Sequence, residues 1–170
     1  MTKMKRNVSR RVVLSIVALS GVVAVGSAAA QGMAKEGRLD ISSCWSGTNS
    51  VVAVSKTDLA FSYEMTGTSR SNPPGGAFDM TTFRCVGIVT AIGGKSPGTA
   101  VCESVDKDGH KWFAQYVGDG PKYNGTVLAG AGKYEGMTAN FSTENVGPFP
   151  TVKPGTFQNC NRQTGTYKMK

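Results

Sequence analysis

Residues 59–66, Leu-Ala-Phe-Ser-Tyr-Glu-Met-Thr, alternate strictly between large apolar side chains and small or polar ones. In an extended chain Leu59, Phe61, Tyr63 and Met65 point to one side, and the residues between them point to the other. Alternation with a period of two is the primary sequence signal of a β-strand that is buried on one face. The stretch therefore predicts a strand whose aromatic face packs into the interior, with Glu64 facing outward.

Similar short segments rich in β-branched and aromatic residues recur along the chain, separated by turn residues. They span residues 41–55, 81–91, 99–105, 110–117, 126–129, 137–143 and 155–167. No segment shows sustained helical periodicity, and no repeat of 20–50 residues is found. An even series of about eight short strands predicts an all-β domain, either an antiparallel barrel or a sandwich.

The first thirty residues have the composition of an export signal. Residues 1–11 are basic, residues 12–26 are apolar, and the alanines at 28–30 supply a small-residue cleavage pattern. The apolar stretch has 15 residues, fewer than the roughly 20 that span a bilayer. Arg10-Arg11 also resembles a twin-arginine signal, so both that route and the general secretory route stay open. We expect cleavage near Gln31, no stable membrane anchor afterwards, and a periplasmic or extracellular protein.

The charge of the chain depends strongly on this leader. The 170 residues carry +8, with 19 Lys and Arg against 11 Asp and Glu, but five of the basic residues precede residue 31. The remaining residues carry 14 basic and 11 acidic side chains, a net charge of +3. Nucleic-acid binders gather basic residues on the folded domain, so we predict no nucleic-acid partner. Residues 31–40 are predicted to be a flexible tail, and residues 41–170 a single β-domain.

The chain has four cysteines: Cys44, Cys85, Cys102 and Cys160. In a small exported domain an even number of cysteines predicts two disulfides, with three connectivities open. Cys85 and Cys102 flank Gly93-Gly94 symmetrically, as partners across a hairpin would, although Pro97-Gly98 is a competing turn. This spacing favours Cys85–Cys102. It leaves Cys44–Cys160 to join the first and last strands of a closed sheet.

Metal ligands and catalytic bases are scarce in the sequence. There is no C-x-x-C pair and His110 is the only histidine, so we predict no metal site and no cofactor. Glu103 is the weak catalytic candidate, because it lies well inside a predicted strand. A two-residue turn would set it against Ala114, and a three-residue turn ending at Gly109 against Phe113. If its carboxyl were buried in the interior, burial would raise its pKa and suit it to acid–base chemistry.

Residues 127–138, Val-Leu-Ala-Gly-Ala-Gly-Lys-Tyr-Glu-Gly-Met-Thr, resemble the Gly-rich stretch of allene oxide cyclase-like barrels, and dirigent proteins share a similar stretch. The resemblance covers about half of the chain. It departs from the family pattern at Ala131, where Thr is usual, and at Asn140, where Gly is usual. The resemblance implies an eight-stranded calycin-like barrel with an apolar lumen, often oligomeric, so a homo-oligomer is expected. It does not transfer a reaction.

A barrel of eight strands has room for its own side chains or for one small ligand. The predicted lining residues are Phe61, Tyr63, Trp112 and Tyr116, and Arg70 in the loop 67–79 is predicted to meet an anionic head group. The sequence therefore predicts a protein that binds a small apolar ligand. Two alternatives stay open: an isomerase or cyclase that acts in the lumen through Glu103, and a protein-interaction module that uses loops 67–79 and 145–156.

Overall fold

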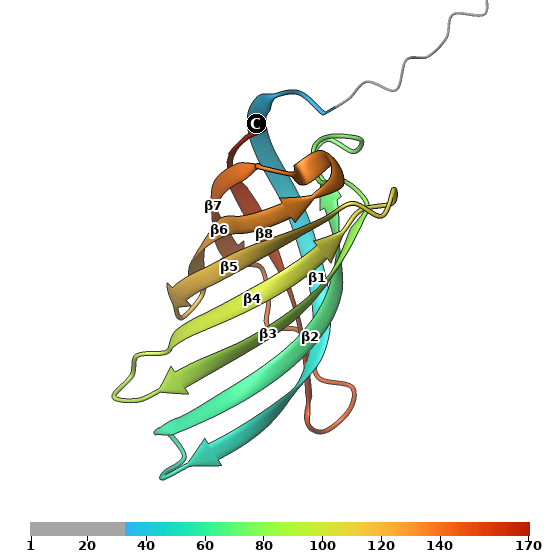
Figure 1. The fold of residues 1–170 in the computed structure, drawn as a ribbon. Helices are drawn as coiled ribbons and strands as arrows, with labels where there is room; N and C mark the ends of the chain where they lie inside the picture. The colour runs from blue at the N-terminus through green and yellow to red at the C-terminus, as the bar shows by residue number, and fades with distance from the viewer. Residues whose placement is uncertain (1–32) are drawn as a thin grey trace, which may run out of the picture. The chain divides into compact units, whose positions relative to one another are not determined.

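The computed structural model describes residues 33–170, and the predicted export signal lies outside them. These residues form eight antiparallel strands that close into a single barrel (Figure 1). The strands are β1 (Glu36–Ala53), β2 (Leu59–Ser71), β3 (Thr81–Ala91), β4 (Pro97–Val105), β5 (Lys111–Asp119), β6 (Lys122–Ala131), β7 (Thr138–Asn145) and β8 (Thr156–Lys168). A short 3₁₀ turn, η1 (Gly132–Tyr134), follows β6. The predicted all-β, eight-stranded antiparallel barrel is confirmed.

The strands follow one another around the barrel in the order of the sequence. Each pairs with its neighbour along the chain, and β1 also pairs with β8, so the sheet has no free edge. The closing ladder runs from the pair Glu36–Lys168 to the pair Thr48–Thr156. Closure of this kind satisfies the backbone groups that an open sheet would leave exposed at its edges.

Two predicted boundaries are wrong, because strands continue where the sequence suggested irregular chain. β1 begins at Glu36, so residues 36–40 are not a flexible tail, and Leu39 is buried opposite Gly165 of β8. β2 continues through residues 67–71, which the sequence suggested were loop. The inward positions there are Gly67, Ser69 and Ser71, and such small side chains give no apolar alternation to recognise.

Both predicted disulfides are confirmed, and they lie on opposite sides of the sheet. Cys85 and Cys102 are directly opposite on β3 and β4, are almost completely buried, and line the lumen. Cys44 and Cys160 are directly opposite on β1 and β8, and Cys44 is exposed on the outer surface. Two disulfides are consistent with an oxidising extracellular or periplasmic environment.

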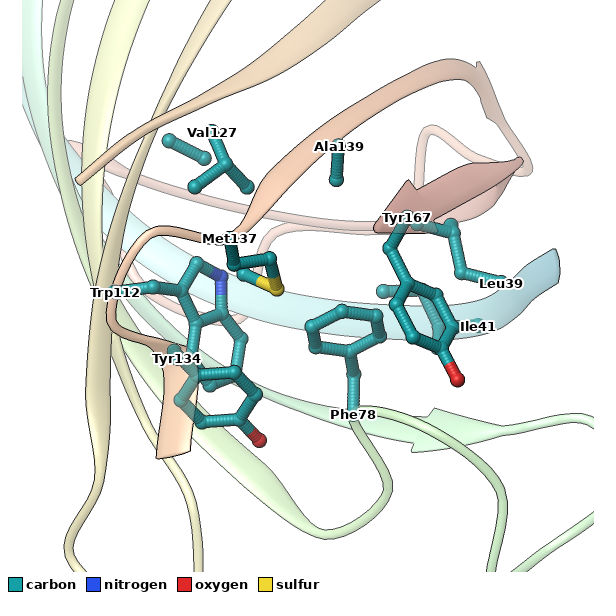
Figure 2. Packing of buried hydrophobic residues seen from close by; sticks show 10 residues of the cluster. Leu39, Ile41, Phe78, Trp112, Val127, Tyr134, Met137, Ala139 and Tyr167 are labelled. Atoms are coloured by element: carbon teal, nitrogen blue, oxygen red, sulfur yellow. The ribbon is translucent and has the colours of Figure 1, made fainter. Parts of the chain in front are cut away.

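One end of the barrel is closed by a cluster of aromatic rings, which we call the floor (Figure 2). Phe78, from the loop between β2 and β3, lies at its centre. Its ring centroid is 5.4 Å from that of Trp112, 5.8 Å from Tyr134 and 5.4 Å from Tyr167. The four rings come from distant parts of the chain, so the floor ties together the loops and strand ends at this end of the barrel.

Two carboxylates support the floor, the half-buried Asp79 and the buried Asp106. Asp79 fixes the loop that carries Phe78, since it accepts hydrogen bonds from the backbone N–H groups of Ser71 (2.9 Å) and Gly75 (2.7 Å). Asp106 accepts a hydrogen bond from the Tyr134 hydroxyl at 3.0 Å. The Gly-rich stretch after β6 thus serves to turn the chain and bring Tyr134 into the floor, with Gly132 at a φ of 66°.

Candidate functional site

Above the floor the lumen contains a cavity of about 360 Å³, lined by residues of all eight strands. This volume lies within the range of about 300–1,000 Å³ that is usual for small-molecule sites. The lining residues Asn49 and Gly120 are exposed to solvent, so the cavity opens at the end opposite the floor. Among the described residues, none that lines the cavity is Asp, Glu, Lys, Arg or His. The site is therefore an uncharged pocket with one closed and one open end.

Strands β2 to β5 contribute a largely apolar wall, which we call the aromatic wall. It contains Phe61, Tyr63, Met65, Phe83, Val89, Ala100 and Tyr116, together with the inner disulfide. Two glycines at inward positions make room for the rings. Gly87 lies opposite Tyr63, and Gly67 lies opposite Phe83. A Cβ atom at residue 87 would overlap the Tyr63 ring, and one at residue 67 would lie 2.5 Å from Phe83.

The two tyrosines of this wall are neutral at physiological pH. Burial, together with the nearby Tyr123, raises the pKa of Tyr63 to about 12. Burial likewise raises the pKa of Tyr116, although a hydrogen bond to Gln163 acts in the opposite direction. Both phenols therefore act in the lumen as hydrogen-bonding groups and not as charges.

The opposite side of the lumen, formed by β7, β8 and β1, carries polar side chains beside apolar ones such as Trp45, Phe141 and Phe157. We call its polar part the carboxamide wall. It carries five side-chain amides: Asn49, Asn145, Asn159, Asn161 and Gln163. Three of them occupy alternate positions of β8, so they point inward in a row. Asn161 has Ser43 beside it on β1 and Asn145 beside it on β7.

A hydrogen-bond network connects the two walls across the lumen. The Tyr116 hydroxyl donates to Oε1 of Gln163 at 3.3 Å. Nε2 of Gln163 donates to Oγ of Ser43 at 3.1 Å and to Oδ1 of Asn161 at 3.2 Å. Ser43 and Ser69 share a hydrogen bond of 2.7 Å between their hydroxyl groups. A network of buried polar groups that bond to one another holds the side chains in one arrangement.

The structure brings four of the five predicted ligand-binding residues together. Phe61, Tyr63, Trp112 and Tyr116 all line the cavity, with Trp112 at the floor. Arg70 does not line it. Its side chain lies on the exposed outer face, with Nε 2.9 Å from Oδ1 of Asp79, so it cannot meet a ligand held in the lumen as the sequence predicted.

Glu103, the catalytic candidate, also lies outside the lumen, so its predicted role there is wrong. It is opposite Phe113, as the three-residue turn requires, and its side chain points outward. Its Oε1 atom is 2.7 Å from Nζ of Lys111. That hydrogen bond and charge lower the pKa of Glu103 instead of raising it. Glu64 faces outward as predicted and pairs with Arg84 at 2.7 Å.

The carboxamide wall was missed by sequence reasoning. The signal was present in the last strand, where Asn159, Asn161 and Gln163 alternate with other residues at period two. Asn and Gln in a strand are usually taken to face solvent, and only closure of the barrel shows that these face inward. Within residues 33–170 no group of three or more His, Cys, Asp or Glu side chains is placed to hold a metal ion. No helix in the same part of the chain is long and apolar enough to cross a membrane.

Comparison with known proteins assigns no function to this chain, so the proposal below is argued from the lumen. The resemblance of residues 127–138 to the allene oxide cyclase-like barrels stays a prediction. No protein-family model matches the chain, and no curated protein matches it.

Proposed function

We propose that this protein binds a small, uncharged and largely apolar ligand inside its barrel, and that it does so outside the cytoplasm. The observation that carries the proposal is the cavity of about 360 Å³, which is lined by aromatic rings and amides and by no charged side chain of the described residues. Burying apolar surface against such a wall is favourable. A charged ligand would lose its hydration there and find no opposite charge in return.

The lining favours binding over catalysis. An isomerase or cyclase that moves a proton needs an acid or base beside its substrate, with a pKa near the working pH. Glu103 lies on the outer face, and the phenols of Tyr63 and Tyr116 have raised pKa values. The described lining residues thus offer hydrogen bonds and apolar contacts, which are sufficient for a carrier or sensor.

The proposal is tested with the uncharged fluorescent dye N-phenylnaphthylamine, whose emission increases in an apolar site. The purified protein is expected to bind the dye saturably, at one dye per barrel. Ala100→Phe fills the lumen, because Ala100 is buried on its wall, and is expected to weaken dye binding at least tenfold. Val101→Phe is the matched control, because Val101 is the next residue of β4 and faces outward.

Two results would contradict the proposal. One is a wild-type protein that shows no saturable increase in fluorescence. The other is an Ala100→Phe variant that is folded, as judged by near-ultraviolet circular dichroism, and still binds the dye as the wild type does. If Ala100→Phe does not fold, Asn49→Trp obstructs the opening instead, because Asn49 is a solvent-exposed residue of the cavity lining.

A further inference from the structure

The two-sided lumen constrains the chemistry of its ligand further than size and polarity do. The amide oxygens of the three carboxamide-wall residues on β8 are already engaged by the protein. Oδ1 of Asn159 accepts a hydrogen bond from the backbone N–H of Cys160 at 2.8 Å, and Oδ1 of Asn161 accepts one from Gln163 at 3.2 Å. Oε1 of Gln163 accepts from Tyr116. These acceptors are therefore occupied before any ligand arrives.

The amide nitrogens of Asn159 and Asn161 are different. Neither Nδ2 atom has a hydrogen-bond partner within residues 33–170. Asn161 is 7% exposed, so its amide is not simply turned to bulk solvent. In the same residues no side-chain nitrogen or oxygen that is fully enclosed lacks a partner. Nδ2 of Asn161 must therefore border the cavity, as a donor without an acceptor.

A ligand that fills the cavity without offering this donor an acceptor would leave it unpaired, which costs free energy. Across the lumen lie the rings of the aromatic wall, whose flat faces pack well against another ring. From this arrangement we infer that the ligand is an uncharged ring compound with a carbonyl-type oxygen, held between the aromatic wall and the Nδ2 groups of Asn161 and Asn159. The inference rests on the proposed function and specifies the class of ligand.

The row of amides also suggests where a second oxygen would lie. Residues two apart on a strand are separated by roughly 7 Å. A compound with one carbonyl oxygen would reach Asn161, the more buried of the two. A second acceptor would have to lie about that distance further toward the opening to reach Asn159.

The test compares two bicyclic compounds of similar size, coumarin and naphthalene, as competitors of bound N-phenylnaphthylamine. Coumarin carries a lactone carbonyl and naphthalene has no acceptor oxygen. Asn161→Leu removes the donor while keeping a side chain of similar volume. The ratio of the naphthalene dissociation constant to that of coumarin is expected to fall roughly threefold to tenfold in this variant, the effect of losing one hydrogen bond. Asn124→Leu, on the outer face of β6, is the matched control and is expected to leave the ratio unchanged.

A second measurement needs no variant. The carbonyl stretching band of coumarin bound to the wild-type protein is expected to lie at a lower wavenumber than in an apolar solvent, because a hydrogen bond weakens the C=O bond. An unshifted band, or a ratio that is the same in Asn161→Leu and the wild type, would overturn this inference while dye binding still supported the proposed function. A wild-type protein that fails to bind the dye would instead overturn the proposed function and this inference together.

Discussion

Removing the outer disulfide is expected to destabilise the barrel more than any single hydrogen bond or ion pair in it. The perturbation is the double substitution Cys44→Ala and Cys160→Ala, which deletes the only covalent link between β1 and β8 in the described residues. Because Cys44 is exposed on the outer face, truncating it leaves no internal cavity. The decrease in the free energy of unfolding should therefore come mainly from the larger entropy of the unfolded chain.

The magnitude follows from the length of chain that the bridge closes. Cys44 and Cys160 are 116 residues apart, for which the chain-entropy relation gives about 4.8 kcal/mol. The inner bridge closes a loop of 17 residues, for which it gives about 3.1 kcal/mol. Domains of this size have free energies of unfolding of about 5–15 kcal/mol. Loss of the outer bridge is thus expected to remove a third or more of the stability.

The assay is equilibrium unfolding in guanidinium chloride, followed by the fluorescence of Trp45 and Trp112, which both line the lumen. A loss in the free energy of unfolding of less than about 2 kcal/mol would refute the argument from loop entropy. A mild reductant followed by alkylation and mass spectrometry provides an independent check. Cys44–Cys160 is expected to open first, because Cys85 and Cys102 are buried. Labelling of Cys85 and Cys102 before the outer pair would contradict the assignment of inner and outer faces.

Three further outcomes are expected. Phe78→Ala removes the central ring of the floor and is expected to lower the free energy of unfolding by about 3–5 kcal/mol, measured by denaturant titration; a loss below about 1 kcal/mol would contradict the role of the floor. Although burial raises the pKa of Asp79, hydrogen bonds from backbone N–H groups and Arg70 lower it from 3.8 to about 2. The ionised carboxylate therefore stabilises the fold above pH 3.8, and this stabilisation is lost as the pH falls toward 2. Asp79→Asn should reduce the melting temperature at pH 7, and the melting temperature of this variant should decline less than that of the wild type between about pH 4 and 2. Gly87→Ala introduces a Cβ into the space of the Tyr63 ring, so it is expected to destabilise the fold by about 1–3 kcal/mol and to change the near-ultraviolet circular dichroism spectrum, whereas an unchanged spectrum and stability would refute the close fit.

The barrel could be predicted from the sequence where large side chains alternate. Phe61 and Tyr63 identify an inward face without any tertiary information. The symmetric spacing of Cys85 and Cys102 about Gly93-Gly94 indicated the correct hairpin, and both glycines have positive φ values of 60° and 77°. Where the inward positions are small, as at Ser69, the same strand continues without a recognisable pattern.

The direction of Glu103 could not be predicted, because it depends on a local choice of turn. The carboxylate of Asp106 accepts hydrogen bonds from the backbone N–H groups of Asp108 at 2.9 Å and His110 at 3.0 Å. These bonds stabilise the longer turn and so set Glu103 opposite Phe113. Composition and spacing allow either turn, and the difference between them moves a side chain from one face of the sheet to the other.

The candidate site was predictable in part for a similar reason. Aromatic residues have few favourable locations besides an interior, so placing Tyr116 in the lumen needed only the correct fold class. Asn161 and Gln163 are equally compatible with either face of a strand. They become lining residues because β8 closes against β1, which brings Ser43 within hydrogen-bonding distance of Gln163.

The pairing of β1 with β8 also makes the order of the strands cyclic. Glu36 and Lys168 are directly opposite each other in the closing ladder, so a short linker could join the two ends of the described domain. New ends could then be opened at the tight turn between Asp119 and Lys122, which lies at the far end of the barrel from the floor. Every strand would keep both of its partners in such a circular permutant. The new chain termini, and any tag attached to them, would lie beside the opening of the lumen.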